Sequence, residues 1–267
     1  MDIDIKKIKD MPYVEFMAFL DEINRPPGGK VALKKMLDYC DVDKTSKILD
    51  IGCNTGFCSF ESVLLKNCQV VGIDLSTDMI KTANKKLLEF DKLVRDKISF
   101  FNYDAKKMPF LDNEFDFIFS GGSTAFIDDI DLALLEYKRV LKSWGFFGDI
   151  NFFYSEKPRE GLIDELNELM GTNIVEWNKE MWIEKYIRAG FEVFDILEEE
   201  ISYVDDNKIE EYVYELLSNK NEEVKKASSE KLKNIMELFN ENHKFLKYGI
   251  FIMRKREIRE EPYLFKP

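Results

Sequence analysis

The stretch KILDIGCNTGF, residues 47–57, joins a short apolar run to a turn that contains two glycines. An apolar run this short is typical of a buried strand. Glycine allows a positive φ, and it lets a ligand come close to the main chain. The spacing is D-x-G-x-x-x-G, from Asp50 through Gly52 to Gly56. We therefore expect a strand, a glycine turn and a helix whose first N–H groups face a ligand.

The pattern of strand followed by helix repeats along the chain. Further apolar runs, rich in β-branched and aromatic residues, lie at 69–74, 98–102, 115–120, 146–153, 191–197 and 248–254. Segments with helical periodicity lie at 57–66, 76–90, 129–142 and 179–189. This alternation predicts an α/β fold with a Rossmann-like, mostly parallel sheet of seven strands and helices on both faces.

Three helical additions accompany this pattern, at about 12–24, 156–178 and 205–246. The last of them reads as two amphipathic helices, 207–218 and 222–242. No repeat, low-complexity segment or linker separates them from the rest. We expect one domain over 1–267, with a core of about 30–200 and 247–256 and with the additions forming a cap.

Charge and composition argue against several classes of partner. The chain has 51 acidic and 39 basic side chains, a net charge of -12, which repels nucleic acid and anionic membranes. It has neither a signal-like N-terminus nor 18 consecutive apolar residues. The four cysteines form no CxxC pair, and the single histidine, His243, lies far from them, so we expect no metal. A cytoplasmic location is expected, and the oligomeric state is not indicated.

A dinucleotide cofactor is a poor fit to the glycine turn. The motif G-x-G-x-x-G would place glycine at 52, 54 and 57, where the chain has Gly52, Asn54 and Phe57. Phenylalanine at the third position would push the helix away from the strand. The spacing therefore disfavours NAD and FAD.

With this spacing the sequence resembles the class I S-adenosylmethionine-dependent methyltransferases, particularly their small-molecule branch, which includes the ubiquinone and menaquinone biosynthesis enzymes. The resemblance covers about 45–200 and rests on five elements in order. They are ILDIGCNTGF, VVGIDLSTDMIKTA, FNYDAKKMPFLDNEFDFIFSGG, EYKRVLKSWGFFGDINFF and YIRAGFEV. Two departures stand out: Asn54 where many members have glycine, and Ser143-Trp144-Gly145 where Pro-Gly-Gly is usual.

The resemblance implies a binding site for S-adenosylmethionine. The glycine turn would wrap the amino-acid end of the cofactor, Asp74 would bind both ribose hydroxyls, and Leu75 would lie against adenine. Asp104 would accept from the adenine amino group, and Ala105 would supply a main-chain contact. The full set of expected cofactor residues is Asp50, Gly52, Cys53, Gly56, Asp74, Leu75, Asp104, Ala105 and Ser120.

The acceptor is less defined by the sequence. The Asn/Asp-Pro-Pro-Tyr/Phe motif of nucleobase and glutamine methyltransferases is missing at 120–123, so a small-molecule acceptor is expected. Tyr13 and Arg25 precede the first strand, where the family's N-terminal helix often closes over the site, and both are candidates for substrate contact. No catalytic residue is indicated, since methyl transfer from a sulfonium depends mainly on positioning.

Other interpretations remain open at this point. The two glycines could serve only to pack the strand tightly against the helix, and Asp104 could be a helix cap. The chain could also bind S-adenosylmethionine as a scaffold without turnover.

Overall fold

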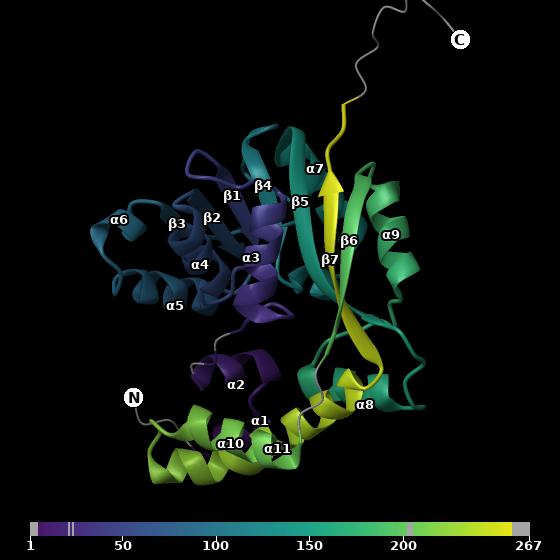
Figure 1. The fold of residues 1–267 in the computed structure, drawn as a ribbon. Helices are drawn as coiled ribbons and strands as arrows, with labels where there is room; N and C mark the ends of the chain where they lie inside the picture. The colour runs from purple at the N-terminus through teal and green to yellow at the C-terminus, as the bar shows by residue number, and fades with distance from the viewer. Residues whose placement is uncertain (1–4, 21, 23, 202–204, 258–267) are drawn as a thin grey trace, which may run out of the picture.

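The computed structural model describes residues 5–20, 22, 24–201 and 205–257, and its centre is one sheet (Figure 1). The strands are β1 (Lys47–Ile51), β2 (Gln69–Asp74), β3 (Ile98–Asn102), β4 (Phe115–Ser120), β5 (Leu141–Tyr154), β6 (Glu192–Glu200) and β7 (Leu246–Arg254). Their order in the seven-stranded sheet is β3-β2-β1-β4-β5-β7-β6. β1 to β5 pair in parallel, and β7 runs antiparallel to both of its neighbours. The predicted fold class is confirmed.

Helices cover both faces of this sheet. On one face α3 (Gly29–Tyr39), α4 (Phe57–Lys66) and α5 (Thr77–Leu87) pack through Leu33, Phe60 and Ala83. On the other face α7 (Ile130–Val140) and α9 (Lys179–Arg188) pack through Leu134 and Trp182. Each face buries a continuous apolar core, which is why the parallel strands read as unbroken apolar runs. The short α6 (Lys92–Arg95) and the 3-10 helix η1 (Ser123–Phe126) were not predicted.

A third hydrophobic cluster joins helices from both ends of the chain. They are α1 (Ile5–Asp10), α2 (Tyr13–Phe19), α8 (Leu162–Met170), α10 (Asp206–Leu217) and α11 (Glu222–His243). Ile8, Phe16, Val213 and Leu232 are buried among them. Figure 1 shows α1, α2, α8, α10 and α11 below the sheet, with the arrow of β7 pointing away from them. Because β7 is antiparallel to β5, the carboxyl end of β5 points towards these helices.

The additions differ in length from their predictions. The helix expected at 12–24 ends at Phe19, and residues 21 and 23 lie outside the described part. The segment expected at 156–178 contributes one helix, Leu162–Met170, whereas the two helices expected at 207–218 and 222–242 match α10 and α11 closely. In the described part of the chain, every helix is too short or too polar to cross a bilayer.

Trp144 lies in a bulge near the start of β5. Phe115 pairs with Leu141, but Phe117 pairs with Phe146, so extra residues bulge out of β5. Trp144 takes a φ of 66° there, a conformation that favours glycine. Its N–H donates to the carbonyl of Lys255 at 2.7 Å, and the guanidinium of Arg254 lies 4.6 Å from the ring centroid. These contacts hold tryptophan in an unfavourable backbone conformation.

Candidate functional site

The glycine turn lies where the strand order reverses. β1 is flanked by β2 on one side and by β4 on the other, and ligands of open α/β sheets bind at the carboxyl ends of strands at such a point. Three residues of the turn have positive φ: Gly52 at 64°, Asn54 at 49° and Gly56 at 93°. Asn54 thus takes the left-handed conformation that glycine usually supplies, and asparagine is among the few other residues that adopt it readily.

Each glycine of the turn has a protein atom close to it. A Cβ on Gly52 would lie 2.3 Å from the Cβ of Ser123, and a Cβ on Gly56 would lie 2.7 Å from a ring carbon of Phe60. Phe100 is nearly as close to Gly56, at 2.8 Å. Tight packing, the alternative raised above, is thus a sufficient reason for both glycines. It is compatible with a ligand at the main chain on another side.

Asp74, the last residue of β2, is fixed by main-chain donors. Its Oδ2 accepts from the Asn54 N–H at 2.9 Å, and its Oδ1 accepts from the Ser76 N–H at 2.8 Å. Burial raises the pKa of this carboxyl, and the two main-chain hydrogen bonds oppose that shift. A carboxylate has about four lone-pair sites, so two further donors can still bind.

Leu75 and the neighbouring strand β3 lie next to Asp74. The side chain of Leu75 is 74% exposed. The Asn102 amide on β3 donates to the carbonyls of Asp74 and Leu75, at 2.9 and 2.8 Å. The end of β2 therefore presents a fixed carboxylate next to an open apolar surface.

Asp104 and Ala105 follow β3 in a turn and not in a helix. Asp104 Oδ1 accepts from the Lys106 N–H at 2.9 Å, and the Asp104 carbonyl accepts from the Lys107 N–H at 3.0 Å. Ala105 packs against the hydrophobic core between the sheet and helices α7 and α9. The helix-cap interpretation of Asp104 is wrong, because the residue closes an Asx-type turn within a loop.

Asp50 lies in β1 ahead of the glycine turn, Cys53 lies within the turn, and both side chains are buried. Asp50 is 2% exposed and accepts from the Ser59 hydroxyl of α4 at 2.6 Å. Burial raises the pKa of Asp50 to about 7, against the effect of the Ser59 hydrogen bond. Burial also raises the pKa of the Cys53 thiol well above its usual value, so this thiol is not a nucleophile at neutral pH. Asp50 thus joins the end of β1 to α4, and Cys53 is part of the buried side of the turn.

A chain of hydroxyl groups links the end of β4 to the end of β1. Ser123 Oγ donates to the Ile51 carbonyl at 2.6 Å and lies 3.0 Å from Ser120 Oγ. Thr124 Oγ1 lies 2.8 Å from Ser120 Oγ. Because the Ser123 proton is used on a carbonyl, Ser120 donates to Ser123, and Thr124 donates to Ser120. Sequence reasoning named Ser120 but missed Ser123 and Thr124, although SGGST is a visible cluster of small residues.

The segment 24–28, which we call the strap, contacts the loop after β1 and the loop after β4. Asn24 Nδ2 donates to Asn54 Oδ1 at 3.0 Å, and the guanidinium of Arg25 lies 5.8 Å from the Phe57 ring centroid. Pro26 contacts Gly121, since a Cβ built there would be 3.1 Å from Pro26 Cβ. Arg25 is therefore next to the expected cofactor turn.

Tyr13, the other substrate candidate, lies within the helical cluster. Its ring meets Phe239 of α11 edge to face, with 5.6 Å between the centroids. Burial, with a smaller effect of Glu22, raises the pKa of Tyr13 to about 12. The structure does not bring Tyr13 against the glycine turn.

Sequence reasoning also missed a buried polar group on β5. The Tyr186 hydroxyl donates to Asp149 Oδ2 at 3.0 Å, and burial raises the pKa of Asp149 to about 7. Among the described residues Tyr137 Oη, Asp149 Oδ1 and Asn151 Oδ1 are buried without a hydrogen-bond partner. The only signal in the sequence is GDIN within an otherwise apolar strand.

The described residues contain no group of three or more His, Cys, Asp and Glu side chains that could hold a metal ion. The absence of a metal stays a prediction.

Comparison with known sequences gives a family and two useful relatives. Residues 49–148 match the family described as a methyltransferase domain. A demethylmenaquinone methyltransferase of Staphylococcus carnosus is 33% identical over 118 residues, 43% of this chain and 47% of that protein. The match thus spans about half the length of that enzyme. An uncharacterised protein of Haemophilus influenzae is 22% identical over 87% of this chain and 94% of its own length.

Solved structures with a similar fold cover most of this chain. The crystal structure of MccD protein has a TM-score of 0.77 at 25% identity and covers 87% of this chain and 100% of that one. Phosphoethanolamine N-methyltransferase 2 of Haemonchus contortus, solved with phosphomonomethylethanolamine and S-adenosylhomocysteine, has a TM-score of 0.71 at 18% identity. It covers 96% of this chain and 61% of that chain. Residues 49–148 thus match a methyltransferase domain, and the sheet order and these relatives support a class I S-adenosylmethionine-dependent methyltransferase of the small-molecule branch.

Proposed function

We propose that this methyltransferase binds S-adenosylmethionine at the carboxyl ends of β1 and β2 and transfers its methyl group to a small molecule. The observation that carries the proposal is the fixed carboxylate of Asp74, held by the Asn54 and Ser76 N–H groups beside the glycine turn. A carboxylate with free lone pairs is the natural partner of two adjacent hydroxyls, as on a ribose.

The residues around Asp74 suit the rest of this cofactor. The exposed side chain of Leu75 offers an apolar surface for adenine, and the turn at Asp104 and Ala105 follows the neighbouring strand. The turn from Gly52 to Gly56, which includes Cys53, would take the amino-acid end, with Asp50 just ahead of it in β1 and Ser120 beside it across the sheet. These residues fit a charged nucleoside. A pyrophosphate site would need a third glycine, where this chain has Phe57.

When bound, S-adenosylmethionine supplies an electrophilic methyl group on a sulfonium sulfur. The residues of the chain then need only to align the acceptor and to exclude water. Alignment of two reactants reaches effective molarities of about 10⁵–10⁸ M, and the exclusion of water prevents side reactions. The strap is well placed to exclude water, because Asn24 and Pro26 already contact the loops after β1 and β4.

The acceptor we propose is a small molecule. The helices α1, α2, α8, α10 and α11 lie beyond the carboxyl end of β5, where they would wall the acceptor site and obstruct a macromolecule (Figure 1). The net charge of -12 also opposes a nucleic acid acceptor. Arg25, beside the turn, is a candidate to pair with an acidic group of cofactor or acceptor.

The test has two stages. Calorimetry with S-adenosylhomocysteine and with NAD should give saturable binding of the first and none of the second. A metabolite screen that detects S-adenosylhomocysteine formed from S-adenosylmethionine should then identify an acceptor. Binding without product in a broad screen would favour the scaffold interpretation, and NAD binding would reject the proposed site.

A further inference from the structure

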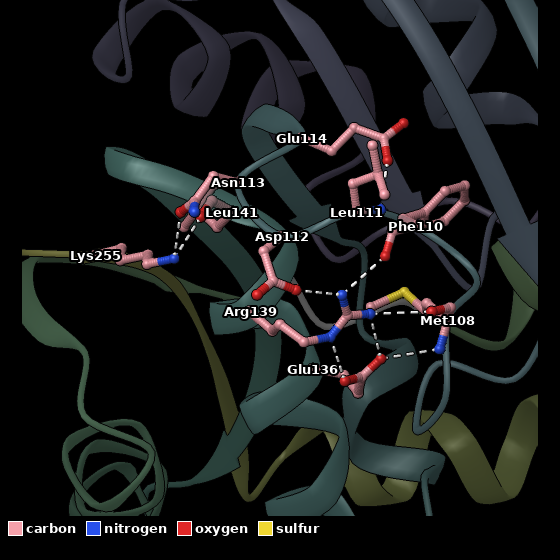
Figure 2. A network of polar contacts seen from close by, with 10 residues as sticks. All are labelled: Met108, Phe110, Leu111, Asp112, Asn113, Glu114, Glu136, Arg139, Leu141 and Lys255. Carbon is pink, nitrogen blue, oxygen red and sulfur yellow. Dashed lines mark hydrogen bonds and ion pairs between the residues drawn. The ribbon is translucent and has the colours of Figure 1, made fainter.

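A side-chain pair on α7 fixes the loop that carries Asp104 and Ala105. Glu136 and Arg139 lie three residues apart near the end of that helix. Arg139 Nε and Nη2 donate to the two carboxylate oxygens of Glu136, at 2.7 and 2.8 Å. Two parallel hydrogen bonds of this kind hold both side chains in one geometry. Figure 2 shows the pair facing the loop between β3 and β4.

The pair grips the main chain of Met108. The Met108 N–H donates to Glu136 Oε2 at 2.9 Å, and the Met108 carbonyl accepts from Arg139 Nη2 at 3.0 Å. The Met108 side chain is buried, which holds the residue from a third direction. The segment that follows Asp104 and Ala105 is therefore held at Met108 by two main-chain hydrogen bonds and a buried side chain.

Arg139 uses all of its donors. Its Nη1 donates to the Phe110 carbonyl and to Asp112 Oδ1, both at 2.8 Å, so each of the five N–H bonds of a guanidinium has an acceptor. Lysine has three donors and no planar fork, and it cannot reproduce this set. The side chains of Arg139 and Glu136 are only 30% and 20% exposed, so water screens these contacts incompletely.

The far end of the loop is joined to the end of α7 as well. The Asn113 N–H donates to the Arg139 carbonyl at 3.0 Å, and the Glu114 N–H donates to the Val140 carbonyl at 2.8 Å. Lys255 Nζ donates to Asn113 Oδ1 and to the Leu141 carbonyl, both at 2.7 Å (Figure 2). Asn113 and Glu114 are thus anchored without the side chain of Arg139, whereas the part near Met108 depends on the pair.

We propose that Arg139 is a positioning residue for cofactor binding, which holds the turn of Asp104 and Ala105 in place for the adenine ring by fixing Met108. The proposal rests on the proposed function, because it places adenine at this turn. A preorganised loop loses no further entropy when a ligand binds. A loop released from Arg139 must be ordered by the ligand, so affinity falls although every contacting residue is unchanged.

The test compares two ligands on one variant. Arg139→Met should weaken binding of S-adenosylhomocysteine in calorimetry by roughly tenfold, through the ordering that the ligand must now impose. Methylthioadenosine has the adenosine half but lacks the amino-acid end, and its binding should weaken by the same factor. Arg139→Lys, which keeps the charge, should fall between Arg139→Met and the wild type. The matched control is Arg188→Met, which removes an exposed ion pair with Glu184 on α9 and should leave both affinities unchanged.

A second measurement keeps the test informative if Arg139→Met folds poorly. The Met108 amide should exchange its hydrogen slowly in the wild type and faster in Glu136→Ala. In Glu136→Gln, which retains an acceptor oxygen, it should exchange at close to the wild-type rate. A Met108 amide that exchanges equally in all three proteins would overturn the proposal.

The remaining outcomes separate the two claims. If the wild-type protein binds neither ligand, the proposed function fails. If the wild type binds and Arg139→Met binds equally well, only the role of Arg139 is wrong. A larger loss for S-adenosylhomocysteine than for methylthioadenosine would also contradict it, because the effect would then lie at the glycine turn.

Discussion

The main chain at Gly52 is constrained both by its own conformation and by its neighbour. Its φ is 64°, and Ser123 fills the space where a Cβ would be. Gly52→Ala should therefore lower the free energy of unfolding by about 1–2 kcal/mol for the left-handed backbone and by about 1–3 kcal/mol more for the clash. Urea unfolding measures the sum.

Two variants separate these effects. Gly171 has a φ of 63° and no atom within 4 Å of a built Cβ, so Gly171→Ala reports the backbone cost alone. Ser123→Gly also removes the hydrogen bond to the Ile51 carbonyl, so the clash is measured as the difference between the cost of Gly52→Ala in the wild type and its cost in the Ser123→Gly background. If Gly52→Ala costs the same in both backgrounds, Ser123 is not the reason for the glycine. If the double variant folds but still binds S-adenosylhomocysteine weakly, the cofactor also lies against Gly52.

Asp74 is the single side chain on which cofactor binding should depend most. Asp74→Ala removes the expected hydrogen bonds to both ribose hydroxyls, and it should cost about 1–3 kcal/mol of binding free energy. Calorimetry with S-adenosylhomocysteine measures this loss. The control is Asp78→Ala, whose carboxylate is exposed and pairs with Lys81 at 2.9 Å. Equal affinities of the two variants would show that the ribose is misplaced.

Among the helices, α11 holds the N-terminal helix α1 through one lysine. Lys231 Nζ donates to the carbonyls of Ile8, Lys9 and Met11 at 3.1, 2.9 and 2.6 Å, and it lies 4.8 Å from the Phe16 ring centroid. A cation at a helix C-terminus satisfies carbonyls that the helix itself cannot.

Lys231→Met should lower the free energy of unfolding by about 2 kcal/mol, since it strips partners from partly buried carbonyls. Lys225→Met, on the same helix, removes only a surface pair with Glu222 and should cost less than about 0.5 kcal/mol. Urea unfolding of the two variants side by side decides the matter. Similar losses would mean that the carbonyl contacts contribute nothing.

At the level of elements, local sequence patterns predicted what is locally determined. The strand at 69–74 and the helix at 57–66 have the predicted bounds, because apolar periodicity and flanking breakers define both. β5 begins at Leu141 and not at 146, since a bulge held by Lys255, the residue after β7, lets pairing start earlier. Helix α1, with the sequence IKKIKD, has too few apolar residues to be recognised and depends on its packing against α11.

The candidate site divides in the same way. Local patterns predicted the positions of four expected site residues in the fold, because each lies in or next to a strand that the sequence shows. They are Asp50, Gly52, Gly56 and Asp74. Contacts between distant segments could not be predicted. Examples are the packing of Ser123 against Gly52 and the hydrogen bond from Asn24 to Asn54. Such contacts depend on how the strands are ordered in the sheet, which no local pattern encodes.

Across the whole molecule, two buried carboxyl groups link stability to pH. Burial raises the pKa of Asp50 and of Asp149 to about 7, whereas an unfolded aspartate has a pKa of about 3.9. Between these values the folded protein binds the proton and the unfolded chain does not. Each group therefore makes the protein less stable as pH rises from about 4 to 7, and its contribution is constant above 7.

Asp149→Asn should remove one of these contributions. Relative to wild type, the variant should gain about 1–2 kcal/mol of unfolding free energy between pH 5.5 and pH 8.5. This range avoids the isoelectric point of about 4.9. Urea unfolding at both pH values gives the difference. A difference between variant and wild type that does not change with pH would place the pKa of Asp149 outside this range.

The account as a whole depends on where the cofactor binds, and a crystal structure with S-adenosylhomocysteine tests this most directly. We predict both ribose hydroxyls within about 3 Å of the Asp74 carboxylate, adenine between Leu75 and the turn of Asp104, and the amino-acid end at the turn from Gly52 to Gly56. A ligand bound anywhere else, with that turn still covered only by the protein's own side chains, would contradict the account.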